Sequence, residues 1–346
     1  MERDLTPEWI LKETLSVQHK ALMDYVKEKT GAKDDGGLTL TVLGCGTMGI
    51  AILGGILDSL SSSESATSDT ADTQSTPQKL PTKFNACVRR PESAKRIKTE
   101  LGKYPAFQQV TLYENENAKP VQEADVILLG CKPYMVGDIL KAEGMQKALA
   151  GKLLISICAG VTEEQIAQYL LPTPEGQSEC TVVRAMPNTA AAVRESMTVI
   201  GTSHPPLPAE TDSLVTWIFT RIGRVVHLPP SNMDACTALC GSGPGFVAVM
   251  AESLAAGGIA MGIPREEAYL MAAQTMRGTT GLLLAGEHPA ILRDKVSTPG
   301  GCTIGGLLVL EEGMLRGTIA KAVREATVVA SQLGQGKVGV NGTRRV

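Results

Sequence analysis

Over the first half of the chain, apolar residues gather in short blocks that are rich in Val, Ile and Leu. Such blocks predict buried strands. They span residues 38–43, 84–88, 124–131, 153–158 and 180–186. Between them, apolar residues recur at helical spacing, at 49–57, 91–101, 134–150 and 162–170. Strands that alternate with helices predict a parallel sheet with helices on both of its faces.

After about Pro208 the strand pattern fades and helical spacing takes over. The predicted helices cover residues 210–221, 232–240, 244–261, 264–286, 288–295 and 303–334. The stretch 244–261 is nearly uncharged, so we expect it to be buried on all sides. The pattern therefore predicts an α/β domain over residues 38–207 and an all-α domain over residues 208–334.

Three segments lie outside this pattern. Residues 1–37 contain a predicted amphipathic helix at 7–29 and form an N-terminal helical extension. Residues 59–82 form an insertion, because 11 of the 18 residues from 59 to 76 are Ser or Thr and no apolar periodicity survives there. The polar residues 335–346 form a tail that we expect to be frayed.

The composition excludes several classes of function. Lys and Arg number 33 and Asp and Glu 36, so the formal net charge is −3, and aromatic residues are 3% of the chain. A slightly acidic chain with few aromatic residues is not expected to bind nucleic acid. We see no run of about 18 apolar residues, so we expect no membrane span.

Cysteine and histidine usage bears on the compartment and on metals. The eight cysteines contain no CxxC pair, and five of them lie in apolar or Gly-rich stretches, where reduced cysteine is a small hydrophobic residue. This usage favours a reducing compartment, and no signal peptide is visible, so we expect a cytoplasmic protein. The four histidines lack metal-ligand spacing, and no metal site is predicted.

The first candidate site is Gly44-Cys45-Gly46-Thr47-Met48-Gly49, which follows the first predicted strand and opens a helix. In a dinucleotide-binding loop, the first glycine permits the tight turn and the second lets the backbone approach a pyrophosphate. The third lets helix and strand pack closely, and the helix N-terminus donates N–H groups to the phosphates. A plain glycine turn is the alternative, but the position at the start of a βαβαβ pattern favours the dinucleotide site.

The end of the second predicted strand indicates which dinucleotide would bind. An NAD site places an acid there to bind the ribose 2′-hydroxyl. This chain instead has Arg89-Arg90, and guanidinium groups suit a 2′-phosphate. Two solvated surface arginines are the alternative, and the missing acid weighs against it.

Three further segments carry candidate chemistry, each with a structural alternative. Lys132 follows a strand on the same edge as the glycine loop, and it either reaches the cofactor or is a solvated loop lysine. Residues 240–246 place glycines at a helix start, which is either an anion site or a close helix crossing. Residues 296–303 combine hydroxyl groups with Pro299 and Gly300-Gly301, which is either a donor loop for a carboxylate or a long helix–helix turn.

Taken together, these motifs resemble the pyrroline-5-carboxylate reductases over about residues 38 to 334, outside the insertion. The motifs that carry the resemblance are the glycine loop at 44–49, Cys131-Lys132-Pro133 after Ala124-Asp125-Val126, Arg184-Ala185-Met186-Pro187-Asn188-Thr189, Gly241-Ser242-Gly243-Pro244 and Asp294-Lys295-Val296-Ser297-Thr298-Pro299-Gly300-Gly301. The resemblance implies reduction of 1-pyrroline-5-carboxylate to L-proline, the last step of proline biosynthesis, by hydride transfer to the cyclic imine. It implies NADPH as the cofactor, with NADH as the alternative.

The resemblance also implies a fold and an assembly. An α/β N-terminal Rossmann-type dinucleotide-binding domain precedes an all-α dimerisation domain, which is similar to the C-terminal domain of 6-phosphogluconate dehydrogenase. Such helical domains interlock in a homodimer. Many members of the family assemble further to decamers, so the size of the oligomer stays open.

The resemblance assigns residues to two sets. The cofactor set is Gly44, Gly46, Thr47, Met48, Gly49, Arg89, Arg90, Asn117, Lys132, Pro133, Ala159 and Gly160. The substrate set is Asn188, Ser242, Gly243, Ser297, Thr298, Gly300, Gly301 and Thr303, with the 297–303 loop supplied by the partner subunit. Some members carry Thr on the helix near the substrate nitrogen, but this chain has Val249 there, so no side chain is assigned as acid or base.

Two other functions fit parts of the pattern. A β-hydroxyacid dehydrogenase shares the two-domain plan but uses a lysine early in the helical domain, and no lysine occurs between Lys152 and Lys295. A non-catalytic NADP-binding sensor would keep the fold, yet the intact 294–303 segment argues against it. Consumption of NADPH with pyrroline-5-carboxylate, compared with 3-hydroxyisobutyrate plus NADP, separates the three functions.

Overall fold

The computed structural model describes residues 37–62, 77–171, 179–335, 337, 339–340 and 342–343. Its contacts divide the chain into two units, Met1–Gly37 and Leu38–Val346. The predicted helix at 7–29 and residues 63–76 of the predicted insertion lie outside the described residues. So does much of the predicted tail, including residues 344–346.

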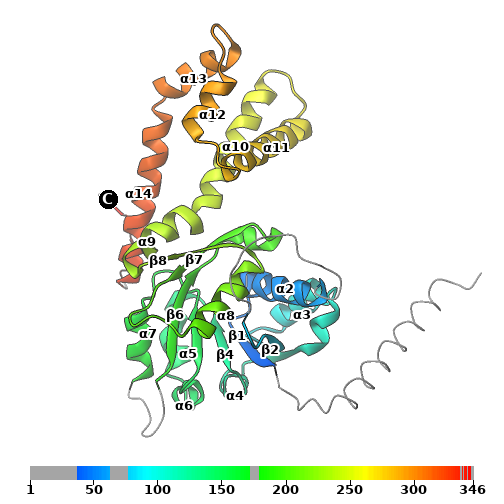
Figure 1. Ribbon diagram of the computed structural model, residues 1–346, viewed down its shortest axis with the longest axis vertical. Helices are drawn as coiled ribbons and strands as arrows, with labels where there is room; N and C mark the ends of the chain where they lie inside the picture. The colour runs from blue at the N-terminus through cyan, green and yellow to red at the C-terminus, as the bar shows by residue number, and fades with distance from the viewer. Residues whose placement is uncertain are drawn as a thin grey trace, which may run out of the picture. The chain divides into compact units, whose positions relative to one another are not determined.

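An eight-stranded sheet organises the second unit, in the order β3-β2-β1-β4-β5-β6-β7-β8 (Figure 1). The strands are β1 (Leu38–Leu43), β2 (Pro81–Val88), β3 (Val110–Glu114), β4 (Val126–Leu129), β5 (Leu153–Ser156), β6 (Thr181–Met186), β7 (Ser196–Gly201) and β8 (Gly223–Leu228). Neighbouring strands are parallel, except that β6 and β7 are antiparallel. The order of the strands reverses between β1 and β4, which is where doubly wound sheets bind ligands.

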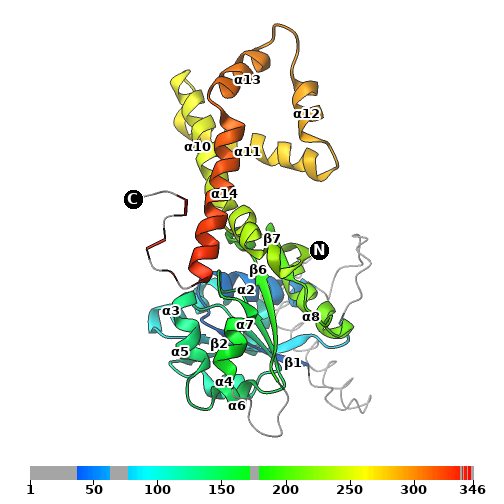
Figure 2. The same ribbon diagram turned by 90° about the vertical axis from the view of Figure 1, so that its left-hand side faces the viewer.

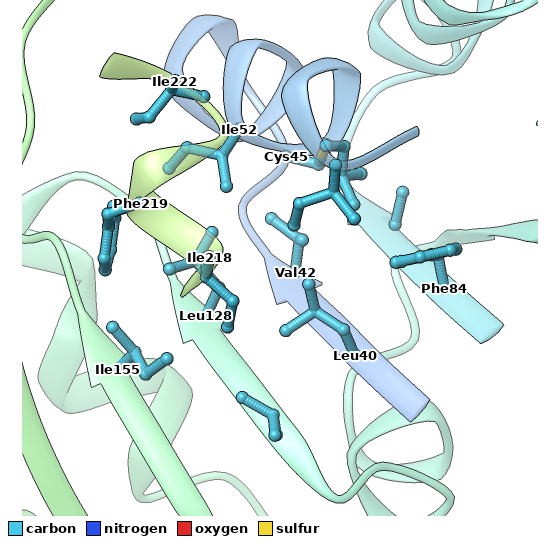
Figure 3. Close-up of a cluster of buried hydrophobic side chains, with 14 of the residues drawn as sticks. Leu40, Val42, Cys45, Ile52, Phe84, Leu128, Ile155, Ile218, Phe219 and Ile222 are labelled. Carbon is cyan, nitrogen blue, oxygen red and sulfur yellow. The ribbon is translucent and has the colours of Figure 1, made fainter. Parts of the chain in front are cut away.

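Helices cover both faces of this sheet. They are α2 (Thr47–Ser62), α3 (Pro91–Leu101), α4 (Ala118–Gln122), α5 (Val136–Leu140), α6 (Met145–Leu149), α7 (Glu163–Leu170) and α8 (Ala209–Thr220). Figure 3 shows one face, where Ile52 of α2 and Ile218 of α8 meet strand residues that include Val42 and Leu128. Side chains alternate across a strand, so the neighbouring Ile127 belongs to a second cluster, with α4 to α7.

The sequence pattern missed three of these strands, which are β3, β7 and β8. The prediction that strands end before Pro208 is wrong, because β8 pairs in parallel with β7 along its whole length. Strands β3 and β8 are the two edge strands of the sheet, and none of their residues is fully buried. Their sequences therefore lack a continuous apolar block. The sheet therefore continues to Leu228, and the all-α region begins after it rather than at residue 208.

The predicted insertion at 59–82 is also shorter than expected. Helix α2 continues to Ser62 instead of ending near Leu57, and β2 already begins at Pro81. The Arg221 Nη1 donates a hydrogen bond to Ser59 Oγ at 3.0 Å. This contact with the end of α8 holds a Ser-rich turn in the helix, which composition alone does not reveal.

The region after β8 is helical. Its elements are α9 (Met233–Cys236), the π-helical turn η5 (Thr237–Gly241), α10 (Gly243–Ala260), α11 (Arg265–Leu284), α12 (Pro289–Val296), α13 (Cys302–Glu312) and α14 (Leu315–Gly334). The single helix predicted over 303–334 is two helices, because Met314 adopts a left-handed φ of 50° between them. Likewise, the helix predicted over 134–150 is divided into α5 and α6 before Gly144, whose φ is 78°.

The apolar helices of this region are exposed in the single chain. Only Ala255 is buried on α10, so the expectation that 244–261 is buried on all sides is wrong for one subunit. Within Pro230–Ala260, an 18-residue window has a mean hydropathy of 1.3, and only 6% of that window is buried. By length and composition alone this stretch could cross a membrane, so the expectation of no membrane span is not confirmed and stays a prediction.

Candidate cofactor and substrate site

The three glycines of the loop between β1 and α2 have three different surroundings. Gly44 has a φ of +78°, and a Cβ there would lie 2.8 Å from the Cα of Cys131. A Cβ on Gly49 would lie 3.0 Å from Val42 Cγ1, so helix and strand touch at this point. A Cβ on Gly46 would meet only the Gly44 oxygen, at 4.0 Å. The exposed backbone of Gly46 thus leaves room for a phosphate at the N-terminus of α2.

The two predicted arginines lie beside this loop in the fold. Arg89 and Arg90 directly follow β2, which pairs with β1, and both side chains are exposed. Their backbone continues into α3, with Arg90 as the residue before its first turn. The parallel pairing of β1 and β2 places both arginines at the same sheet edge as the glycine loop.

A third arginine, which the sequence analysis did not single out, reaches the loop from α3. The Arg96 Nη1 donates a hydrogen bond to Thr47 Oγ1 at 3.0 Å, and its Nε donates to Glu100 Oε1 at 2.5 Å. Arg96 stands among the charged residues of an amphipathic helix, so nothing in its local sequence distinguishes it from a solvated residue. Only the packing of α3 beside α2 brings its guanidinium to the first turn of α2.

The remaining predicted cofactor residues follow three other strands. Asn117 lies just beyond β3 and precedes α4, where its carbonyl accepts a hydrogen bond from Val121 N at 3.2 Å. Lys132 and Pro133 follow β4 and are exposed. Ala159 and Gly160 follow β5, the first exposed and the second buried. All of these positions are at the carboxyl ends of parallel strands, which meet at one edge of a sheet.

The helical region touches this edge at Gly160. Its φ is +75°, and a Cβ there would lie 3.1 Å from the nitrogen of Gly334, at the end of α14. The Gln165 Nε2 also donates a hydrogen bond to the Gly334 carbonyl at 2.8 Å. A cavity of about 600 Å³ opens beside this contact, and its lining includes Ala159, Gly160, Thr237, Ser242 and Phe246. Ser242, a predicted substrate residue, is therefore brought to predicted cofactor residues.

A π-helical turn positions Ser242. The Ser242 N–H donates to the Thr237 carbonyl at 2.9 Å, five residues back, and the Thr237 hydroxyl donates to the Met233 carbonyl at 2.8 Å. The next residue, Gly243, has open space where a Cβ would stand. π-Helical turns are rare and occur often at functional sites, and the sequence pattern over 232–240 predicted only an ordinary helix.

The 184–189 motif connects the sheet to this turn. Arg184 is 6% exposed, and its Nη2 has no hydrogen-bond partner among the described residues. Burial lowers the pKa of its guanidinium, while Asp234 of α9 and Glu163 of α7 act in the opposite direction. Asn188 is buried as well: its Oδ1 accepts from Ala190 N at 3.0 Å, and its own N–H donates to Ser196 Oγ at 3.0 Å. The amide oxygen of Asn188 thus caps a turn.

The 297–303 loop lies between α12 and α13. The Ser297 Oγ is buried without a hydrogen-bond partner in the described part of the chain. Gly300 has a φ of +69°, and a Cβ on Gly301 would lie 2.5 Å from Thr298 Oγ1. Thr303, on the first turn of α13, is half-buried. The loop therefore keeps the small residues and the free hydroxyl that a carboxylate site needs.

This loop does not join the rest of the predicted site within one chain. Ser297 and Thr298 line a cavity of about 420 Å³ together with Arg293 and Asp294, and this cavity is separate from the one that contains Ser242. In both views α12 and α13 lie at the end of the helical region away from the sheet (Figure 1, Figure 2). One subunit thus presents the two halves of the predicted substrate set at different places.

Comparison with known proteins decides the family. A family model for pyrroline-5-carboxylate reductase dimerisation matches residues 230–333. A model described as NADP oxidoreductase coenzyme F420-dependent matches residues 39–160. The pyrroline-5-carboxylate reductase of Lophium arboricola is 62% identical over 317 residues, which cover 90% of this chain and 98% of that protein. The chain belongs to the pyrroline-5-carboxylate reductase family.

Other members of the pyrroline-5-carboxylate reductase family agree. The enzyme of Neurospora crassa is 55% identical over 328 residues, which cover 90% of this chain and 98% of that protein. The solved pyrroline carboxylate reductase of Plasmodium falciparum, with NADP bound, has a TM-score of 0.65 at 24% identity and covers 86% of this chain and 98% of that one. The structure from Coxiella burnetii has a TM-score of 0.68 with the same coverage and identity. The predicted family, the Rossmann-type fold and the helical region are confirmed.

Proposed function

We propose that this enzyme reduces 1-pyrroline-5-carboxylate to L-proline with NADPH. The observation that carries the proposal is the identity with named pyrroline-5-carboxylate reductases, which is 62% over 317 residues for the protein of Lophium arboricola. The open face at Gly46 supports it, because a phosphate can approach the N-terminus of α2 there without meeting a side chain. NADPH, when bound, supplies the hydride that reduces the imine carbon.

The protein's own groups act mainly by binding and orientation. The substrate is a cyclic imine whose ring nitrogen can arrive protonated, so the need for a strong general acid is small. Alignment of two reactants can by itself lower the activation free energy by about 7–11 kcal/mol. Ala159, Gly160 and Ser242 line one cavity and are suited to hold the nicotinamide beside the substrate ring. We assign no side chain as acid or base.

The preference for NADPH over NADH is argued from two guanidinium groups. Arg89 and Arg90 stand exposed where an NAD site would carry an acid. Arg96 contacts the first turn of α2 through Thr47 and pairs with Glu100, so it bears on the pyrophosphate, which both cofactors carry. Arginine forks bind phosphate oxygens in pairs, which favours a cofactor with a 2′-phosphate.

We propose that the active form is a homodimer, with a decamer as a larger alternative. The exposed apolar stretch Pro230–Ala260 lies in the region that matches the dimerisation model, so a partner subunit accounts for its exposure. A partner would also supply the 297–303 loop, which is separate from Ser242 in one chain. The cysteines are free thiols, which supports a reducing, cytoplasmic location.

One assay tests the activity directly. Oxidation of NADPH is followed at fixed enzyme with pyrroline-5-carboxylate, and reduction of NADP is followed with 3-hydroxyisobutyrate. We expect turnover with the imine, slower turnover with NADH, and none with the hydroxyacid. Turnover with the hydroxyacid alone would indicate a dehydrogenase. NADPH binding without turnover of either compound would indicate a sensor.

A further inference from the structure

Two cysteines face each other at the cofactor edge of the sheet. Strands β4 and β5 are parallel neighbours whose register ends with Leu129 beside Ser156. Cys131 and Cys158 lie two residues beyond the ends of β4 and β5, and their Sγ atoms are 4.0 Å apart. Parallel neighbours lie about 4.8 Å apart, which is within the span that a disulfide bridges.

The two thiols differ in the way that a reactive and a resolving cysteine differ. Cys131 is half-buried, whereas Cys158 is 3% exposed and its thiol donates to the Cys131 carbonyl at 3.3 Å. A hydrogen bond from Cys158 lowers the pKa of the Cys131 thiol, although burial opposes it. The same contact and burial raise the pKa of Cys158. The accessible sulfur is therefore the better nucleophile of the pair.

We propose that Cys131 and Cys158 form an oxidation site, where a peroxide converts the two thiols to a disulfide that blocks cofactor binding. The second half of this statement rests on the proposed function. Neither cysteine is among the residues assigned to the cofactor set or the substrate set, so the proposed oxidation site is additional to both.

The oxidation proceeds in two steps with hydrogen peroxide as the oxidant. The Cys131 thiolate attacks one peroxide oxygen, the O–O bond breaks, and the hydroxide that leaves takes up a proton to become water. The sulfur of Cys158 then attacks the sulfenic sulfur of Cys131. The S–S bond forms as the S–O bond breaks, and the hydroxyl group leaves as water with the Cys158 proton. Both sulfurs are oxidised, and one peroxide is reduced to two water molecules.

The position of Cys131 explains why the disulfide would act on the cofactor. A Cβ on Gly44 would lie 2.8 Å from both the N and the Cα of Cys131, so the glycine loop rests directly on this backbone. The Gly130 N–H also donates to the Leu43 carbonyl at 2.9 Å. The sulfur atoms must approach from 4.0 Å to the disulfide distance of about 2.05 Å. Any backbone shift that accompanies this approach passes directly to the phosphate-binding turn, which rests on Cys131, and to the adjacent Lys132.

Cys45, Cys87 and Cys180 are less suited to this chemistry. Cys45 and Cys87 are each 1% exposed, and burial raises the pKa of both thiols, that of Cys87 to about 12. Cys180 precedes β6 at the opposite edge of the sheet, and burial raises its pKa to about 12 as well. Cys180 therefore serves as a matched control, because its loss leaves the cofactor edge intact.

The test uses the full chain, first assayed in reduced form with NADPH and pyrroline-5-carboxylate. The enzyme is then treated with hydrogen peroxide, and peptide mapping without reduction locates any disulfide. We expect a bond between the peptides of Cys131 and Cys158, and a loss of NADPH binding by fluorescence titration. Turnover should fall by roughly 100-fold, the cost of displacing a reacting group by about 1 Å. Dithiothreitol should restore both NADPH binding and turnover, and saturating NADPH should slow the oxidation.

Two variants separate this proposal from general oxidative damage. Cys158→Ala should form no internal disulfide at Cys131, whereas Cys180→Ser should form it and lose NADPH binding as the parent does. A disulfide that leaves NADPH binding unchanged would overturn the proposal, as would inactivation without the bond. Failure of the reduced enzyme to turn over pyrroline-5-carboxylate would count against the proposed function instead, since the disulfide and the NADPH titration do not depend on that substrate.

Discussion

At the scale of single residues, the proposed phosphate-binding site is centred on Gly46 and its neighbouring glycines. Gly44 and Gly49 are glycines because a Cβ would strike Cys131 or Val42, whereas Gly46 is a glycine with open space around it. Protein packing therefore explains two of the three, and the proposed phosphate site would explain the third. This contrast is the strongest evidence in the structure itself for a phosphate at the N-terminus of α2.

The first prediction concerns Arg89 and Arg90. Replacement of both by Ala should raise the KM for NADPH far more than the KM for NADH, because only NADPH carries a 2′-phosphate. Each lost charge-assisted contact should cost about 1.5–3 kcal/mol, or roughly 10- to 140-fold in KM. Steady-state kinetics with both cofactors make the comparison. Equal effects on the two cofactors would contradict the assignment.

The second prediction concerns Arg96, which touches Thr47. Arg96→Ala should weaken NADPH binding by about 1 kcal/mol, or roughly fivefold, because an exposed charge is screened by solvent. Lys95→Ala, at the neighbouring exposed position of α3, is the matched control and should change the affinity little. Fluorescence titration of NADPH measures both. An equal loss of NADPH affinity in both variants would show that net charge, rather than the contact of Arg96 with Thr47, causes the effect.

At the scale of elements, the close crossing of α2 and the end of α8 organises one face of the sheet. A Cβ on Gly55 would lie 2.6 Å from the Arg221 carbonyl oxygen and 2.7 Å from Ile222 Cγ2, so backbone meets backbone there. At the adjacent Gly54, the nearest atoms are side-chain ends, with Leu101 Cδ2 at 3.2 Å. The two glycines thus offer a paired test of how tightly these helices pack.

We predict that Gly55→Ala lowers the free energy of unfolding by about 1–3 kcal/mol, as overpacking of a core does. Gly54→Ala should cost less, because flexible side chains can move aside. Urea denaturation followed by circular dichroism measures both variants. If Gly54→Ala proves the more destabilising, the crossing at Gly55 is looser than the structure has it.

A further prediction concerns residues 63–76, which leave α2 after Ser62 and return before β2. The chain enters β2 at its N-terminal end, and the cofactor residues follow the opposite ends of the strands. Replacement of 63–76 by a short Gly-Ser linker should therefore leave the KM for NADPH and the turnover unchanged. Halving a loop changes its closure free energy by only about 0.6 kcal/mol. A folded variant with impaired NADPH turnover would show that the segment acts on the site.

The elements differ in how far their sequences reveal them. The central strands β4 and β5 are buried throughout, and β1 is buried from Leu40 to Leu43, so their apolar blocks were visible and predicted both the sheet and the glycine loop. The edge strands β3 and β8 depend on pairing with a neighbour, which a local pattern does not contain. Arg96 and the π-helical turn before Ser242 were missed for the same reason, since tertiary contacts define them.

At the scale of the whole molecule, a single chain leaves an apolar helical surface exposed and the predicted substrate residues apart. Apolar side chains of α10 and α13 are exposed, among them Val249 at 62% and Leu308 at 58%. The 297–303 loop also lines a cavity away from Ser242. A second subunit that packs against these helices and brings its loop to the Ser242 cavity would complete both. The uncharged composition of 244–261 predicted burial, and the proposed partner subunit would provide that burial.

The central claim, a site shared between subunits, is tested most directly by a mixed dimer. Gly46→Val should fill the space proposed for the phosphate, and Gly301→Val should place a side chain against Thr298. Each pure dimer should therefore be inactive. Gly301→Val should still bind NADPH in a fluorescence titration, because its cofactor loop is intact. In verified mixed dimers, one site combines an intact cofactor region with an intact loop from the other chain. The account predicts that these dimers recover NADPH turnover with pyrroline-5-carboxylate, and no recovery would contradict it.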